Sequence, residues 1–147
     1  MRRYSKLKKR IENLFAPDLN MKVYCNVYPS YSSRWFMPNP RVWITLDKEI
    51  IFDFIKDFMK LQIPMHDGTY RTIFYEDVTD ISHTIHEYIE TPVNILFDHI
   101  FEKDCFGLTD ILKAADRRIG KNRLLLLRER TQSEAAKKVI GNRLGAA

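Results

Sequence analysis

Residues 109–127 read T-D-I-L-K-A-A-D-R-R-I-G-K-N-R-L-L-L-L, and this stretch sets the pattern for the C-terminal half of the chain. Thr109 is expected to cap a helix, and Asp110 suits the positive end of its dipole. Apolar residues then recur at helical spacing, and Gly120 is expected to end the helix. Asn122 could cap a further helix through the four leucines, which cover every face of a turn. We expect this second helix to be a core helix, with a dimer seam as the alternative.

The N-terminal half shows strand patterns after one basic helix. Ser5 is expected to cap that helix, and Pro17 to stop it. Residues 21–28 and 41–46 alternate apolar and polar, which predicts half-buried strands. Further strands are expected at residues 49–54 and 70–75, the first of them reached through a tight turn at Asp47-Lys48. Residues 50–59 also fit a helix, and the proline-containing segments 29–33 and 38–40 are expected to be turns or loops.

After Glu76 the apolar period becomes helical, with Asp80 as an expected cap and Thr91-Pro92 as the expected start of the next helix. Strands first and helices later predict an α+β fold. We expect an antiparallel sheet of about four to five strands, flanked by an N-terminal helix and three to four C-terminal helices. The length predicts one domain over residues 1–147, with residues 141–147 as a frayed tail.

Charge is unevenly distributed along the chain. The net charge is +5, but residues 1–45 carry +7, residues 46–110 carry −9 and residues 111–147 carry +7. One interpretation is that the basic ends dock on the acidic middle within the fold. The other is that one of these surfaces attracts a partner of opposite charge.

The two cysteines and the distribution of apolar residues favour a cytoplasmic location. Cys25 and Cys105 are far apart and lack metal-ligand spacing, so a disulfide framework is not expected and a reducing cytoplasm fits best. The basic N-terminus is followed by no apolar signal segment, and no long apolar run occurs. We expect a cytoplasmic protein that does not contact the membrane.

Three motifs resemble those of a family of small uncharacterised bacterial cytosolic proteins. They are S-K-L-K-K-R-I at residues 5–11, W-I-T-L-D at residues 43–47 and D-R-R-I-G-K-N-R-L at residues 116–124. Asn122 stands where the family pattern more often has arginine. The resemblance implies a shared fold, and it carries no activity and no catalytic residue.

Residues 83–90, H-T-I-H-E-Y-I-E, are the strongest candidate for metal chemistry. His83 with Glu87, and His86 with Glu90, are spaced i, i+4 and could ligate a divalent ion. The order lacks the spacing of known zinc helices, and a solvated polar face explains it equally well. We therefore predict no metal, no cofactor and no catalytic residue; nucleophile and phosphate-loop motifs are also absent from the sequence.

Two binding functions remain. The first is an immunity or antitoxin-type protein, expected to be a monomer, that neutralises a basic partner toxin through its acidic middle. Its candidate partner-binding residues are Asp47, Asp53, Asp57, Glu87 and Glu90. The alternative is nucleic-acid binding through the basic cluster of residues 117–130, with strand aromatics as further stacking surfaces. Its candidate anion-binding residues are Arg117, Arg118, Lys121 and Arg123.

Overall fold

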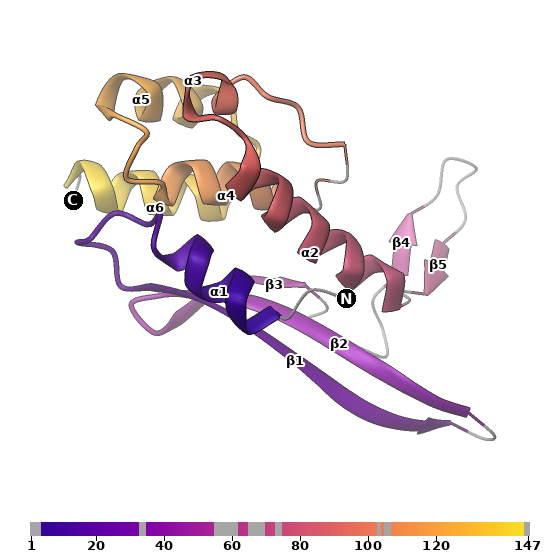
Figure 1. Cartoon of the computed structure of the whole chain (residues 1–147). Helices are drawn as coiled ribbons and strands as arrows, with labels where there is room; N and C mark the ends of the chain where they lie inside the picture. Colours follow the sequence, from indigo (N-terminus) through magenta and orange to yellow (C-terminus); the bar gives the residue numbers. More distant parts are fainter. Residues whose placement is uncertain are drawn as a thin grey trace.

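The computed structural model describes residues 4–32, 35–54, 62–64, 70–72, 75–102, 104 and 107–145. Figure 1 shows their arrangement. The elements in chain order are α1 (Tyr4–Glu12), β1 (Met21–Ser32), β2 (Trp35–Leu46), β3 (Glu49–Phe54), β4 (Gln62–Pro64), β5 (Tyr70–Thr72), α2 (Tyr75–Glu90), α3 (Val93–Leu96), α4 (Leu108–Ala115), α5 (Lys121–Arg130) and α6 (Glu134–Leu144).

The fold is α+β, as predicted, but the sheet is smaller than expected. Strands β1, β2 and β3 form a three-stranded antiparallel sheet in that order, while β4 and β5 pair only with each other. The prediction of one sheet of four to five strands is therefore wrong for the residues that the structure describes. Strand β5 covers Tyr70–Thr72 of the strand expected at residues 70–75, and α2 begins at Tyr75, before the expected cap at Asp80.

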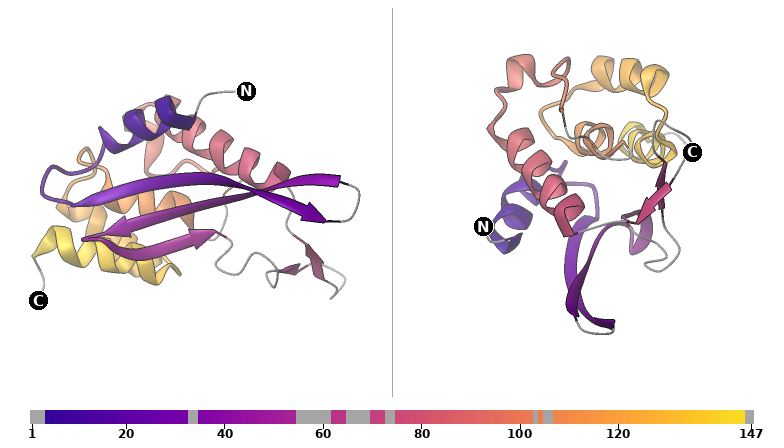
Figure 2. Two further views of the ribbon diagram at one scale, coloured as in Figure 1. Left: turned by 90° about the horizontal axis from the view of Figure 1, so that it is seen from below. Right: turned by 90° about the vertical axis from the view of Figure 1, so that its right-hand side faces the viewer.

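The helices lie over one face of the three-stranded sheet, with α1 and α2 in contact with its strands (Figures 1 and 2). The alternation in β1 and β2 explains this, because Val23, Val42 and Ile44 all turn to the covered face and are almost fully buried. The same core continues into the C-terminal helices. Its buried members there include Leu108, Ile111, Leu112, Ile119, Leu124, Leu127, Val139 and Ile140.

The hairpin between β2 and β3 is confirmed. Asp47 and Lys48 have φ values of 52° and 70°, the left-handed conformation that a type I′ turn requires at both central residues. Asparagine and aspartate tolerate this conformation better than other non-glycine residues, which accounts for Asp47. Strand β3 ends at Phe54, so the strand interpretation of residues 50–54 is also confirmed, and residues 55–59 lie outside the described part.

Strands β1 and β2 run through both proline-containing segments, so the predicted loops at residues 29–33 and 38–40 are wrong for the described residues. The backbone N–H of Val23 donates to Glu12 and its carbonyl accepts from Lys8, so the polar groups of Val23 point away from β2. Pro29 lies six residues further on and shares this orientation. Its partner across the ladder is Pro38. These prolines occupy the positions where β1 and β2 exchange no hydrogen bonds, so no ladder bond is lost.

The start of α4 differs from the predicted cap. Gly107 is the N-cap residue, in a left-handed conformation with φ 77°. Thr109 lies inside the first turn, where its backbone N–H and its hydroxyl donate to the two carboxylate oxygens of Asp104. The carboxylate of Asp104 thus satisfies an open N–H at this helix start from outside the helix.

The helix boundaries after α4 also differ from expectation. Helix α4 ends at Ala115, and Gly120 is the N-cap residue of α5 rather than the end of the preceding helix. Asn122 lies within α5 and does not cap it. Helix α6 continues to Leu144, into the segment expected as a frayed tail, and ends at Gly145 in a left-handed conformation.

The helix expected after Thr91-Pro92 is a single turn, α3. Leu96 and Phe97 are buried, whereas Val93 is 41% exposed and Ile100 is 87% exposed. Among the described helices, none has both the length and the apolar character needed to cross a membrane.

Candidate nucleic-acid interface

Helix α5 and the loop before it carry a basic surface of the described chain. The helix lies with α3, α4 and α6 on the side of the molecule away from β1 (Figures 1 and 2). Leu124 and Leu127 face the core, so they belong to a core helix, while Leu126 is 39% exposed. The cations of this helix and of the loop before it are mostly exposed: Arg117, Lys121, Arg123, Arg128 and Arg130. Glu129 is the one acidic residue between positions 117 and 130.

Arg118 differs from these cations because its guanidinium is bound within the fold. Its Nη2 lies 2.8 Å from Oδ2 of Asp116, whose side chain is fully buried. The hydroxyl of Tyr88 donates to the same oxygen at 2.7 Å. Burial, followed by the charge of Asp116, raises the pKa of Tyr88 well above 10.0, and the hydrogen bond to Asp116 raises the pKa of Arg118. Arg118 therefore holds the loop before α5 in place.

Arg143 fixes the other side of this loop. Its guanidinium donates to the carbonyls of Ala114, Asp116 and Ile119 at 2.8–3.1 Å. The Ala114 carbonyl is one of the last four of α4, which helix geometry leaves without partners, and those of Asp116 and Ile119 lie in the loop that follows, where the Asp116 carbonyl also accepts from the N–H of Ile119. The backbone of Arg117 also donates to Leu14. The loop at residues 116–119 is thus bound both to Arg143 of α6 and to Leu14 of the N-terminal segment.

Phe97 lies beneath two of the exposed cations. The Cζ atoms of Arg123 and Arg130 are each 5.6 Å from the centroid of its ring, within the range of a cation–π contact. Arg130 also pairs with Asp98, with 3.4 Å between Nη1 and Oδ1. Lys113 approaches the same ring from the core, and its Nζ donates to the carbonyl of Phe97. Burial lowers the pKa of Lys113.

The carboxylates predicted to bind a partner are dispersed and largely occupied. Asp47 lies in the β2–β3 turn, where its carboxylate accepts from Asn142 at 3.4 Å. Asp53 is half-buried on β3, and Asp57 lies outside the described residues. Glu87 lies 3.5 Å from His99, and Glu90 accepts a 2.8 Å hydrogen bond from Arg10. Three of the four described carboxylates, those of Asp47, Glu87 and Glu90, therefore already contact other groups of the fold.

Several exposed ion pairs join the basic ends of the chain to its acidic middle. Arg10 of α1 pairs with Glu90, and Lys138 of α6 pairs with Glu49 at 2.9 Å. The pair of Arg130 and Asp98 follows the same pattern. These contacts agree with the interpretation that the charged segments dock on each other. Arg117, Lys121 and Arg128 form no such pair within the part of the chain that the structure describes.

The aromatic residues of the sheet are placed for cross-strand packing. Tyr24 and Trp43 are partners in the β1–β2 ladder, and their rings stack at 5.1 Å. The Nζ of Lys8 lies 4.5 Å from the centroid of the Tyr24 ring, so this ring has a further contact within the fold. Cys25 is half-buried, and burial raises the pKa of its thiol, which disfavours the reactive thiolate. Cys105 lies outside the described residues.

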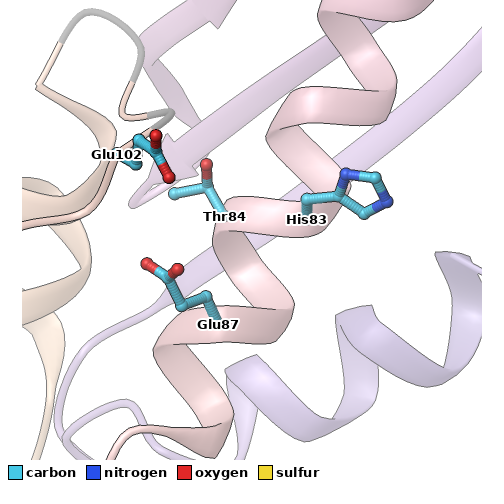
Figure 3. A pocket seen from close by; sticks show the side chains of 4 residues that line it. All are labelled: His83, Thr84, Glu87 and Glu102. Atoms are coloured by element: carbon cyan, nitrogen blue, oxygen red, sulfur yellow. The ribbon is translucent and has the colours of Figure 1, made fainter.

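The H-T-I-H-E-Y-I-E segment lies on α2 and lines a shallow pocket. In Figure 3 the side chains of Thr84, Glu87 and Glu102 point toward a common space, whereas His83 points away. The pocket has a volume of about 150 Å³. His86 lies 3.9 Å from Glu90. The described residues contain no group of three or more His, Cys, Asp or Glu side chains that could hold a metal ion.

Sequence reasoning missed the role of Phe97 and Asp98. Phe97 was not among the candidate site residues, yet it supports two arginines from α5. A signal was present, because Arg123 and Arg130 are seven residues apart and lie on one face of a helix. The sequence alone could not show that residue 97 packs against that face.

Comparison with curated proteins finds no match, and comparison with solved structures finds none either. One family model, described as the SF0329 protein family, matches residues 3–77. The matched segment contains α1 and all five strands, whereas α5 and its basic surface lie outside it.

Proposed function

The chain belongs to the SF0329 protein family, whose description names no activity, and from its own residues we propose that it is a non-catalytic nucleic-acid-binding protein. The binding surface is the basic face of α5 together with Arg117. This surface contacts phosphates and does not read base sequence, because lysine and arginine side chains on a convex helix neutralise the backbone of any nucleic acid.

One observation carries this proposal. Arg117, Lys121 and Arg128 are exposed and form no ion pair with any residue that the structure describes, although the chain contains many carboxylates. Other surface cations, such as Arg10 and Lys138, are paired with carboxylates of the acidic middle. Unpaired cations close together on one surface provide the electrostatic attraction that nonspecific nucleic-acid binding requires.

The test is a fluorescence anisotropy titration of labelled single-stranded RNA and double-stranded DNA at several salt concentrations. We expect a triple substitution, Arg117→Ala, Lys121→Ala and Arg128→Ala, to weaken binding by at least about tenfold at low salt. It should also reduce the slope of log affinity against log salt by about 2 to 3, because each lost phosphate contact contributes about 0.7 to 0.9.

A matched control removes the same charge elsewhere. Lys6 and Lys9 of α1 and Lys22 of β1 are exposed, and the elements α1 and β1 lie apart from α5 (Figure 1). Their simultaneous replacement by alanine should leave the salt slope nearly unchanged. Equal losses in both triple variants would mean that net charge alone drives binding and that α5 is not the site.

The immunity hypothesis, in which the acidic middle of this chain binds a basic toxin, remains as a second candidate with less geometric support. The carboxylates of Glu87 and Glu90 already face His99 and Arg10, so a basic partner would have to displace these internal contacts. This hypothesis predicts a stoichiometric complex with a basic nuclease-type toxin. A pull-down from lysate treated with nuclease would reveal such a complex, and Glu87→Gln with Glu90→Gln should then weaken it.

A further inference from the structure

The arginines over Phe97 differ from the other α5 cations because their positions are restrained. Both guanidinium groups lie 5.6 Å from the centroid of one ring, and that ring is only 8% exposed. A planar guanidinium over an aromatic face loses little further side-chain freedom when it binds an anion. Arg123 and Arg130 also lie two turns apart on the same face of α5.

Resting on the proposed function, we propose that Phe97, Arg123 and Arg130 form a two-arginine clip that binds neighbouring phosphates of one nucleic-acid strand. Asp98 is an internal competitor for this clip. Phe97 is a positioning residue, since it holds the two guanidinium groups and does not itself contact the phosphates. The clip extends the phosphate-binding surface of α5 to its boundary with α3 (Figure 1).

The geometry of Asp98 supports its role as a competitor. Its side chain is 82% exposed and lies 3.4 Å from Arg130, whose side chain is 56% exposed. An exposed pair of this kind contributes little to stability, so a phosphate can replace the carboxylate at a small energetic cost. While the carboxylate stays in place, it neutralises one of the two charges that the phosphates need.

The experiment compares variants that keep or change charge at the clip, with the same labelled RNA and DNA. Arg123→Lys and Arg130→Lys retain the charge but lose the planar stacking group, so we expect about three- to tenfold weaker binding with an unchanged salt slope. Phe97→Leu should have a similar effect, and its thermal unfolding shows whether the variant is folded. Asp98→Asn should tighten binding about two- to fivefold because Arg130 is released.

Glu134→Gln is the matched control for Asp98→Asn. The side chain of Glu134 is 87% exposed and pairs with Lys137 at 3.3 Å, so its replacement makes the same charge change at a similar exposed pair on α6. We expect its affinity for nucleic acid to equal that of the wild type. Equal tightening in both variants would mean that net charge, and not release of Arg130, is responsible, and would overturn the role of Asp98.

The clip and the proposed function can fail separately. If both lysine variants and Phe97→Leu bind like the wild type while the triple variant of Arg117, Lys121 and Arg128 loses affinity, the clip is wrong and the basic α5 surface stands. If the triple variant and the wild type bind equally well, or the wild type does not bind, the proposed function itself is wrong.

Discussion

Asp116 is the residue on which several parts of the chain depend. Its carboxylate is fully buried and accepts from the Tyr88 hydroxyl, from the Arg118 side chain and from the Arg118 backbone. A buried charge is tolerated only where it is paired and hydrogen-bonded, so each donor that is removed leaves a desolvated acceptor. The basic loop before α5 is therefore held by a carboxylate that solvent does not reach.

We expect Tyr88→Phe to destabilise the protein by about 1.5–3 kcal/mol at pH 7, because a hydrogen bond to a buried charged group is lost. Burial and Asp116 hold the pKa of Tyr88 well above 10.0 in the folded state. The folded protein thus retains this proton above pH 10, where the unfolded chain loses it. The stabilising effect of Tyr88 is complete below pH 10 and declines as the pH rises further.

Urea unfolding of the wild type and Tyr88→Phe between pH 8 and pH 11 measures this effect. The difference between the two free energies of unfolding should be constant to about pH 10 and then shrink by up to about 1.4 kcal/mol per pH unit. A difference that stays constant through pH 11 would contradict the raised pKa and the tight contact with Asp116.

At the scale of single elements, Arg143 connects α6 to the end of α4. Replacing it with alanine removes the donors to three carbonyls, and we expect a loss of about 2–3 kcal/mol in the free energy of unfolding. The free energy of unfolding of Arg143→Lys should fall between those of the wild type and Arg143→Ala, because one ammonium group cannot reproduce the planar fork of the guanidinium. Arg128→Ala, an exposed change on α5, should alter stability by less than about 0.5 kcal/mol. Chemical denaturation of all three variants checks this ranking.

Sequence patterns located the elements better than their ends. The alternation of apolar and polar residues identified β1 and β2, because this period depends only on local backbone geometry. The Asp47-Lys48 turn was likewise predicted from local sequence, as a two-residue connection between two strands. Thr109 was wrong as a cap because Gly107 is the N-cap residue and Thr109 lies within the first turn, where its own N–H and hydroxyl donate to Asp104 five residues earlier. Sequence spacing near a helix start does not show which of several neighbouring polar side chains makes such a contact, so the first residue of the helix is easily misplaced.

The sequence predicted which cations gather at the candidate site, but not which of them are exposed and which are bound within the fold. The cluster of cations at residues 117–130 is evident in the sequence, and five of its six members are exposed. The sixth, Arg118, is bound to Asp116, and Tyr88 reaches the same carboxylate from 28 positions away in the chain. No local pattern distinguishes Arg118 from Arg117, because only the folded arrangement decides which of two neighbouring arginines meets the buried acid.

At the scale of the whole molecule, opposite charges far apart in sequence meet at the surface. The pairs of Arg10 with Glu90 and of Lys138 with Glu49 connect both basic ends to the acidic middle. Each exposed pair contributes about 0–1 kcal/mol, so the hydrophobic core and not these pairs supplies most of the stability. The pairs instead determine which cations remain available, and within the described part of the chain Lys121, Arg123 and Arg128 of α5 are among those without an ion pair, whereas Arg130 pairs with Asp98.

The long β1–β2 ribbon extends beyond the helices that cover the rest of the sheet (Figure 2). Pro29 on one of its edges, and Pro38 and Pro40 on the other, lack the N–H that would point outward into solvent. We expect simultaneous replacement of all three prolines by valine to produce soluble oligomers or fibres, detectable by light scattering and thioflavin fluorescence at high protein concentration. A variant that stays monodisperse would show that the edges need no such protection. With the prolines in place, we expect the ribbon not to act as a seed onto which further copies of the chain add strand by strand.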